Sequence, residues 1–526
     1  MYEIELILAL LVAVTVLAMA ASTVRVPYPI LLVLGGVVLA LMPAVPHVEL
    51  APELVFLLFL PPLLYIAGFD TSLREVRAQL PSILSLAVGL VLATTLVVAV
   101  VAHALLPELG WPMAFALGAI VSPPDAVAAT AVLRGLGVPR RLVTLLEGES
   151  LFNDATALVA YQAALGAAAT ASFSPSAALV RFVAAGAGGV LVGLAVGVAV
   201  AGLRRRLHDP PVEITVSLLT PFAAYLPAER LGLSGVLATA TAGLCVGWVA
   251  PRIMEPDTRV RGRAVWDMVV FILNSLVFIL IGLQLSTILG SLSGRLLADL
   301  VGFAARIALV AILMRLVWVF SARYLAWWLA RVRHRHALPP DPRQTFVVGW
   351  AGMRGVVSLA TALALPLGAP ERDLLIFVTF CVILATLVGQ GLTLPLIIRA
   401  LGVGADGDGE RDELRARTAA ADAAVARIEQ LADEWPTHLP LIDALRAQYG
   451  HRATHLSTQP ASANGSPGEG VSDAEQELVE HRKIRRAVID AERAAVLDMR
   501  DRGVIDDDAW RRVERDLDLE ELRMEA

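Results

Sequence analysis

Long apolar segments separated by short polar loops dominate the first 403 residues of the chain. A helix needs about 20 mostly apolar residues to cross the hydrocarbon core of a bilayer. The pattern therefore predicts an all-α polytopic membrane protein with about 13 transmembrane helices. The thirteen segments, numbered in chain order, are residues 4–22, 28–44, 52–69, 80–104, 111–133, 145–167, 177–203, 212–228, 232–250, 265–287, 298–328, 344–367 and 374–399.

Arginine content alternates between successive loops along the whole of this region. Because arginine-rich loops face the cytoplasm, we predict an outer N-terminus, a cytoplasmic C-terminus and insertion in the plasma (inner) membrane. The first segment has no preceding positive charge, unlike a signal peptide, so we expect it to be retained. The arginine-rich loops hold 17 arginines, at positions 25, 74, 77, 134, 140, 141, 204–206, 252, 259, 261, 263, 331, 333, 335 and 343, whereas the loops on the other side hold four, at 181, 230, 295 and 372.

Charge composition divides the chain into two regions. The net charge of −6 averages residues 1–403, with 26 basic and 21 acidic side chains, and residues 404–526, with 17 and 28. We expect a transmembrane domain over 1–403 and a cytosolic tail over 404–526. The two cysteines, Cys245 and Cys381, lie in apolar runs, which excludes a secreted disulfide scaffold. The sequence has no basic stripe of the kind that would indicate nucleic-acid binding.

Thirteen spans are compatible with an internal repeat. If spans 1–6 resemble spans 8–13, the offset of seven helices reverses their orientation in the membrane. Such inverted repeats are common in secondary transporters. Spans 5 and 12 are then equivalent, and both contain helix-breaking residues.

Span 5 contains a carboxylate next to two prolines, in the sequence Ser122-Pro123-Pro124-Asp125-Ala126-Val127. Two prolines remove backbone donors and disfavour helix before them, so we predict a break in mid-membrane. Broken helices in membranes line cavities or are buried in protein. Asp125 is therefore a candidate cation ligand, and the alternative is a proline kink that Asp125 caps.

Span 6 contains Ser150, Asn153 and Asp154. Ser150 and Asp154 are four residues apart and share a helical face, and Asp154 lies about 13 Å into the span. A buried carboxylate can be neutralised by either a proton or a cation, which is the simplest chemistry for exchange. The alternative is a polar network that holds helices together.

Span 12 contains a buried guanidinium, in Gly349-Trp350-Ala351-Gly352-Met353-Arg354-Gly355-Val356. Arginine remains charged and needs an anion. Glu149 is the partner we expect for Arg354, either to position the site or as a purely structural pair. For the other polar groups of spans 10 and 11 we expect structural roles: Asp267, Asn274, Arg306 and Arg315.

The motifs of spans 5, 6 and 12, taken together, resemble the cation:proton antiporter-1 family of sodium/proton exchangers. The stretch from Asn274 to Leu283 resembles its bacterial branch. The resemblance covers about residues 1–403 and implies a homodimer in which a six-helix core moves against a dimerisation bundle. It also implies crossed, unwound helices in spans 5 and 12.

By motif match, the resemblance implies Asp154 as the alternating carrier of cation and proton. Asp125 would support it at the crossing, Asn153 would be its neutral neighbour, Ser150 would offer a hydroxyl ligand, and Glu149 and Arg354 would pair. Two positions depart from the family pattern. Pro124 stands where threonine is frequent, so only its carbonyl could serve the ion. The family often has an acidic residue near Ile66, but here none occurs before Asp70, so the additional carboxylate ligand is not expected.

Because the span 6 pair is Asn153-Asp154 and not two aspartates, we predict electroneutral exchange of one Na⁺ for one H⁺, with K⁺ or Li⁺ as the alternative cation. No cofactor and no enzymatic activity are expected. Two other functions remain open. A cation channel is compatible with the charge pattern, whereas an intramembrane aspartyl protease would carry a Gly-x-Gly-Asp signature, which neither aspartate has.

The tail is predicted to be largely helical. Apolar residues recur at helical spacing in 411–450 and a second helical region covers about 474–524, with a break near Gly503. Residues 453–471 have a disordered composition. Alternating acids and arginines favour a solvated or antiparallel helix pair, and a regulatory or dimer-stabilising role is the alternative.

Overall fold

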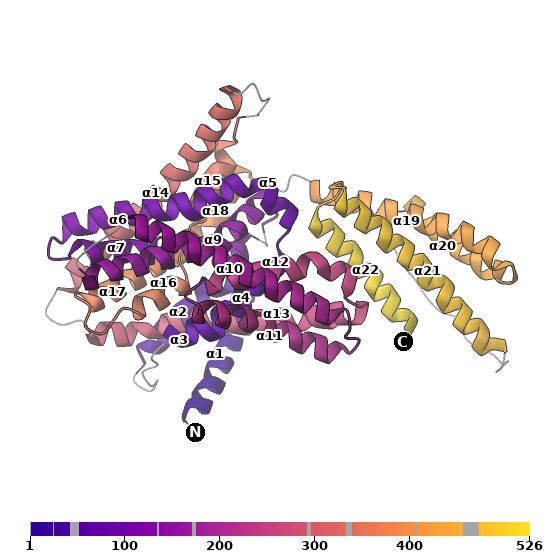
Figure 1. Ribbon diagram of the computed structural model, residues 1–526, viewed down its shortest axis with the longest axis horizontal. Coiled ribbons are helices and arrows are strands. Elements are labelled where there is room, and N and C mark those ends of the chain that lie inside the picture. The colour runs from indigo at the N-terminus through magenta and orange to yellow at the C-terminus, as the bar shows by residue number, and fades with distance from the viewer. Residues whose placement is uncertain are drawn as a thin grey trace. The chain divides into compact units, whose positions relative to one another are not determined.

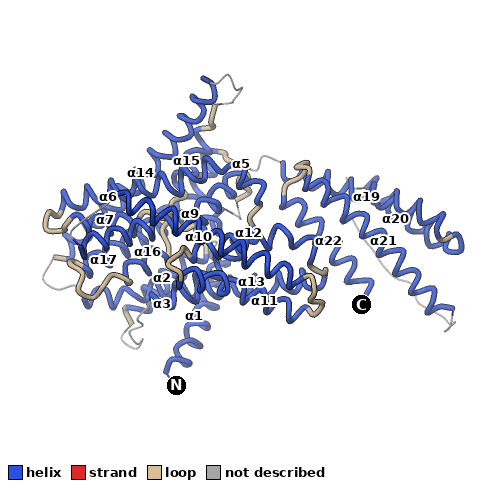
Figure 2. Tube along the Cα trace, in the orientation of Figure 1, coloured by secondary structure: helices blue, strands red, loops and turns tan. Residues whose placement is uncertain are grey.

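The structure is a computed structural model (Figure 1). It describes residues 2–24, 26–42, 52–133, 136–170, 175–291, 296–332, 339–404, 408–455 and 473–525. Helices are the only regular elements in these ranges, as Figure 2 shows. The chain forms two compact units, one of Met1–Met254 with Arg263–Gly404, and one of Glu255–Gly262 with Ala405–Ala526.

All thirteen predicted segments fall on helix, and the all-α polytopic class is confirmed. Among the described residues, six helices are long and apolar enough to span a membrane, and four shorter helices are also apolar. The helices of this region are α1 (Tyr2–Val24), α2 (Tyr28–Ala40), α3 (Pro52–Leu54), η1 (Val55–Phe59), α4 (Leu60–Asp70), α5 (Leu73–Leu84), η2 (Ser85–Leu90), α6 (Val91–Leu105), α7 (Trp111–Val121), α8 (Ala126–Leu133), α9 (Arg140–Thr170), α10 (Pro175–Arg204), α11 (Pro210–Arg230), α12 (Gly235–Ile253), α13 (Pro256–Ser291), α14 (Leu297–Val332), α15 (Pro342–Trp350), α16 (Val356–Leu363), α17 (Arg372–Leu384), η3 (Ala385–Gln390) and α18 (Gly391–Leu401).

Spans 5 and 12 are each divided into two short helices, as predicted. In span 5, α7 ends at Val121 and α8 begins at Ala126, with both prolines in the gap. In span 12, α15 ends at Trp350 and α16 begins at Val356. The two gaps meet, because the Asp125 amide donates to the Met353 carbonyl at 2.7 Å. The crossing implied by the family resemblance is therefore present.

Helices α2 and α13 pack backbone to backbone. A Cβ atom on Gly36 would collide with the Ile279 carbonyl, and one on Gly282 would collide with the Val33 carbonyl. Small residues allow such close approach between membrane helices. The contact fixes the middle of α13, which carries several residues of the site described below.

The tail contains α19 (Asp408–Glu434), α20 (Leu439–His455), α21 (Asp473–Asp501) and α22 (Asp507–Glu525). The helix predicted over 411–450 is interrupted at Pro436. Proline disfavours helix at the residue before it, and this break was not predicted. The predicted break near Gly503 is present, with φ of +78°. Residues 453–471 were predicted to be disordered. Residues 453–455 belong instead to the end of α20, and residues 456–471 lie outside the described residues.

Acidic side chains of α22 surround an arginine within the second unit. Arg259 donates to both carboxylate oxygens of Asp518, at 2.9 and 2.6 Å, and lies 3.7 Å from Glu514. Burial raises the pKa of Glu514 to about 7, and the positive charge of Arg259 opposes this rise. Glu514 therefore changes charge near neutral pH.

Candidate functional site

The crossing of the two broken spans places opposite charges at opposite helix ends. The Asp125 Oδ1 atom accepts from the Val127 amide at 2.8 Å, at the start of α8. Arg354 donates through Nη1 to the Ser122 carbonyl, at the end of α7. Because helix N-termini carry partial positive charge and C-termini partial negative charge, each side chain stabilises the helix end that it contacts. The amide of Arg354 is also fixed, since it donates to Thr386 Oγ1 at 3.1 Å.

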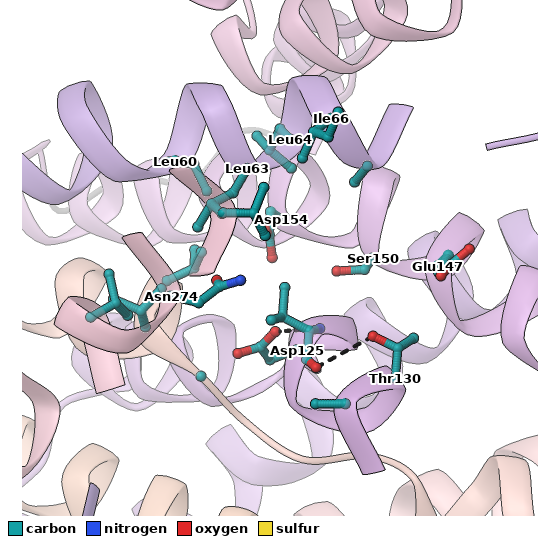
Figure 3. Close-up of a pocket in the computed structure, with 18 of the residues that line it drawn as sticks. Leu60, Leu63, Leu64, Ile66, Asp125, Thr130, Glu147, Ser150, Asp154 and Asn274 are labelled. Carbon is teal, nitrogen blue, oxygen red and sulfur yellow. Dashed lines mark hydrogen bonds between the residues drawn. The ribbon is translucent and has the colours of Figure 1, made fainter. Parts of the chain in front are cut away.

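A cavity of about 420 Å³ lies beside this crossing and contains the predicted ion-binding carboxylates. Asp125, Ser150 and Asp154 all line it (Figure 3). The Asp154 side chain is 6% exposed. The structure thus brings span 5 and span 6 together as the two motifs require, and Ser150 and Asp154 share one face of α9 as predicted.

Asn153, unlike its neighbour Asp154, does not line the cavity. It is fully buried, and its Nδ2 atom donates to the Pro124 carbonyl at 2.8 Å. This bond ties α9 to the unwound stretch before α8. The Pro124 carbonyl, predicted as the oxygen that this position could offer to an ion, already accepts this bond.

The predicted Glu149–Arg354 ion pair is wrong. Glu149 pairs with Arg315 of α14, whose two terminal nitrogens donate to the two carboxylate oxygens at 2.5 and 2.8 Å. Both side chains are 1% exposed. Gly352 leaves room for the Arg315 side chain, because a Cβ atom there would collide with Arg315 Cδ.

The Glu149–Arg315 pair was not predicted, because Glu149 and Arg354 belong to the recognisable motifs and Arg315 does not. The available signal was the position of Arg315 inside an apolar span, because a buried guanidinium needs an anion. That Arg315 of α14 reaches Glu149 of α9 depends on tertiary packing, which helical periodicity does not reveal. Arg354, in turn, has its charge facing a helix end and not a carboxylate.

Charged residues also line the cavity away from the crossing. Asp70, Glu147, Arg263 and Asp267 belong to its lining, and Arg263 donates to Asp70 at 2.7 Å. Asp267 is 67% exposed and lies 3.4 Å from Arg263.

A membrane protein with two broken helices crossing beside buried carboxylates has the architecture of a secondary transporter. The family model described as "Sodium/hydrogen exchanger, transmembrane" matches residues 7–400. The chain belongs to this family.

Named relatives agree with this assignment. An uncharacterized Na(+)/H(+) exchanger of Mycobacterium tuberculosis is 36% identical over 99% of this chain and 96% of its own length. A sodium, potassium, lithium and rubidium/H(+) antiporter of Bacillus pumilus is 35% identical over 75% of this chain and 61% of its own length. The fold is similar to that of the sodium proton antiporter MjNhaP1 from Methanocaldococcus jannaschii, with a TM-score of 0.60 and 19% identity over 76% of this chain and 99% of that one.

Replacing Gly355 by alanine is expected to reduce transport at least tenfold. A Cβ atom there would overlap the Asp125 carboxylate, so Asp125 would have to leave its place at the start of α8. Gly302→Ala is the matched control, because open space surrounds Gly302. Initial transport rates of the two purified variants in proteoliposomes provide the measurement, and equal rates would contradict the expectation.

Proposed function

We propose that this protein exchanges Na⁺, or another alkali cation, for H⁺ by alternating access. The observation that carries the proposal is the common cavity of Asp125 and Asp154 beside the crossed helix breaks. A buried carboxylate is costly unless its charge is compensated. A proton or a cation compensates it equally well in formal charge, so Asp154 can hold one or the other.

Electroneutral exchange follows from this assignment. Asp154 is the carboxylate that would alternate, since its neighbour Asn153 is neutral and engaged with Pro124. Asp125 keeps one oxygen bound to a backbone amide and supports the site. One cation therefore moves for one proton. Family membership favours exchange over the channel and aspartyl protease alternatives.

The choice of cation stays open between Na⁺, K⁺ and Li⁺. The Bacillus pumilus relative is a sodium, potassium, lithium and rubidium/H(+) antiporter, whereas the Mycobacterium tuberculosis relative is described as a Na(+)/H(+) exchanger. Oxygen ligands suit all hard cations, so ligand type alone does not separate them.

The arginine distribution supports insertion in the plasma membrane with the N-terminus outside and residues 404–526 in the cytoplasm. We also propose a homodimer embedded in the lipid bilayer, on the basis of the family resemblance. No nucleic acid is expected as a partner. Cross-linking in native membranes tests the dimer.

The test of function is cation-dependent proton flux in proteoliposomes. We expect added Na⁺ to dissipate an imposed pH gradient, with Li⁺, K⁺ and Rb⁺ compared in parallel. Clamping the membrane potential with valinomycin and K⁺ tests electroneutrality in the Na⁺ arm. A rate that follows the imposed voltage would contradict electroneutral exchange, and absent flux with every cation would contradict the function.

A further inference from the structure

Asn274, on α13, lines the cavity that contains Asp125 and Asp154, and it has no hydrogen-bonding partner among the described residues. Its side chain is 4% exposed, it lines the cavity together with Asp125 and Asp154, and its amide makes no hydrogen bond within the described part of the chain. Figure 3 shows the amide end directed toward the space where the two carboxylates lie. The sequence interpretation gave this residue a structural role.

The surroundings of Asn274 do not explain a polar residue there. Its nearest neighbours in the cavity wall on the same helix are apolar, namely Val270, Phe271, Val277 and Phe278, and the charged Arg263 and Asp267 lie about two to three turns away. The Asn274 amide borders the cavity, where a leucine of similar size would complete an apolar wall. A purely structural asparagine would bond to a neighbouring helix, whereas this one offers its amide to the occupant of the cavity, whether water or an ion.

Two oxygen atoms of span 5 beside the cavity already accept hydrogen bonds. Asp125 Oδ1 is engaged with Val127, and the Pro124 carbonyl is engaged with Asn153. The other side chains of spans 5 and 6 that bring oxygens to the cavity lining are Asp154, Ser150, Thr130 and Glu147, beside the second Asp125 oxygen. Hard cations take their ligands from several oxygens at once.

We propose that Asn274 Oδ1 is a ligand of the transported cation and that Asn274 contributes to cation selectivity. This inference rests on the proposed function. A carboxamide suits a site that alternates between two occupants, because its oxygen accepts the cation and its NH₂ group donates to a carboxylate when no cation is bound. The ligand is fixed on α13 by the close packing of this helix on α2.

The test compares Asn274→Ala, Asn274→Asp and Ser275→Ala in full-length protein reconstituted in proteoliposomes. Ser275 is the matched control, since it is the next residue of α13, is fully buried and lies outside the cavity lining. We expect Asn274→Ala to raise the KM for Na⁺ about tenfold, as for the loss of one contact to a charged group, and to change the order of preference among Na⁺, Li⁺, K⁺ and Rb⁺. Ser275→Ala should retain both the KM and the order.

Asn274→Asp keeps an oxygen ligand of nearly the same shape and adds a titratable group, so we expect cation binding to persist with a changed pH profile of exchange. Stabilisation of the purified variants by NaCl, relative to choline chloride, reports binding without transport. Unchanged KM, selectivity and stabilisation in both Asn274 variants would overturn the inference while leaving the exchanger function intact. Retention of exchange by Asp154→Asn would instead contradict the carrier assignment on which the inference rests.

Discussion

Replacing Asp154 by asparagine is expected to abolish cation–proton exchange while the protein still folds. Asparagine has nearly the same shape, but it neither takes up a proton at physiological pH nor compensates the charge of a cation. Asp154 has no ion-pair partner in the described structure, so its neutral replacement leaves no buried charge behind. The transport rate should fall to that of empty vesicles, and the elution volume in detergent should match the wild type.

The control for this variant is Asp267→Asn. Asp267 also lines the cavity, but its side chain is 67% exposed and lies 3.4 Å from Arg263. Exposed ion pairs contribute little, so we expect this variant to retain most of its transport. Residual Na⁺-dependent proton flux in Asp154→Asn, above the empty-vesicle rate, would remove Asp154 from the carrier role.

The positions of the spans were predictable because bilayer thickness imposes a length and a hydropathy on each one. The break in span 5 was equally predictable, because Pro123 and Pro124 lack the amide protons that a continuous helix needs. These features depend on local sequence alone. The meeting of Asp125 with Met353 depends on how distant spans pack, and it followed only from the family resemblance.

Side-chain partners were the least predictable part of the site. Asp154 and Ser150 were placed correctly because helical periodicity decides which residues share a face. The partner of Glu149 was misassigned because both Arg315 and Arg354 are buried arginines, and their sequence positions do not reveal which guanidinium faces the carboxylate. The position of Asn274 in the cavity wall was not predictable for the same reason, since it depends on which residues lie across the cavity.

Breaking the Glu149–Arg315 pair is expected to cause the largest loss of stability. Replacing Arg315 by methionine leaves the Glu149 carboxylate buried and without its bidentate partner. Removing one member of a buried ion pair typically costs about 3–5 kcal/mol. We expect a clearly lower midpoint of thermal unfolding for the purified variant. Arg306→Met is the matched control, because Arg306 lies exposed on the same helix and its loss should leave the midpoint nearly unchanged.

The double variant Glu149→Gln with Arg315→Met separates the pair's structural role from transport. It removes both charges together, so most of the lost stability should return. If the pair only holds α9 against α14, the double variant should also recover exchange, since Asp154 and Asp125 are intact. A double variant no more stable than Arg315→Met would contradict the direct pairing. Recovered stability without exchange would show that the charges themselves act in transport, beyond holding the helices together.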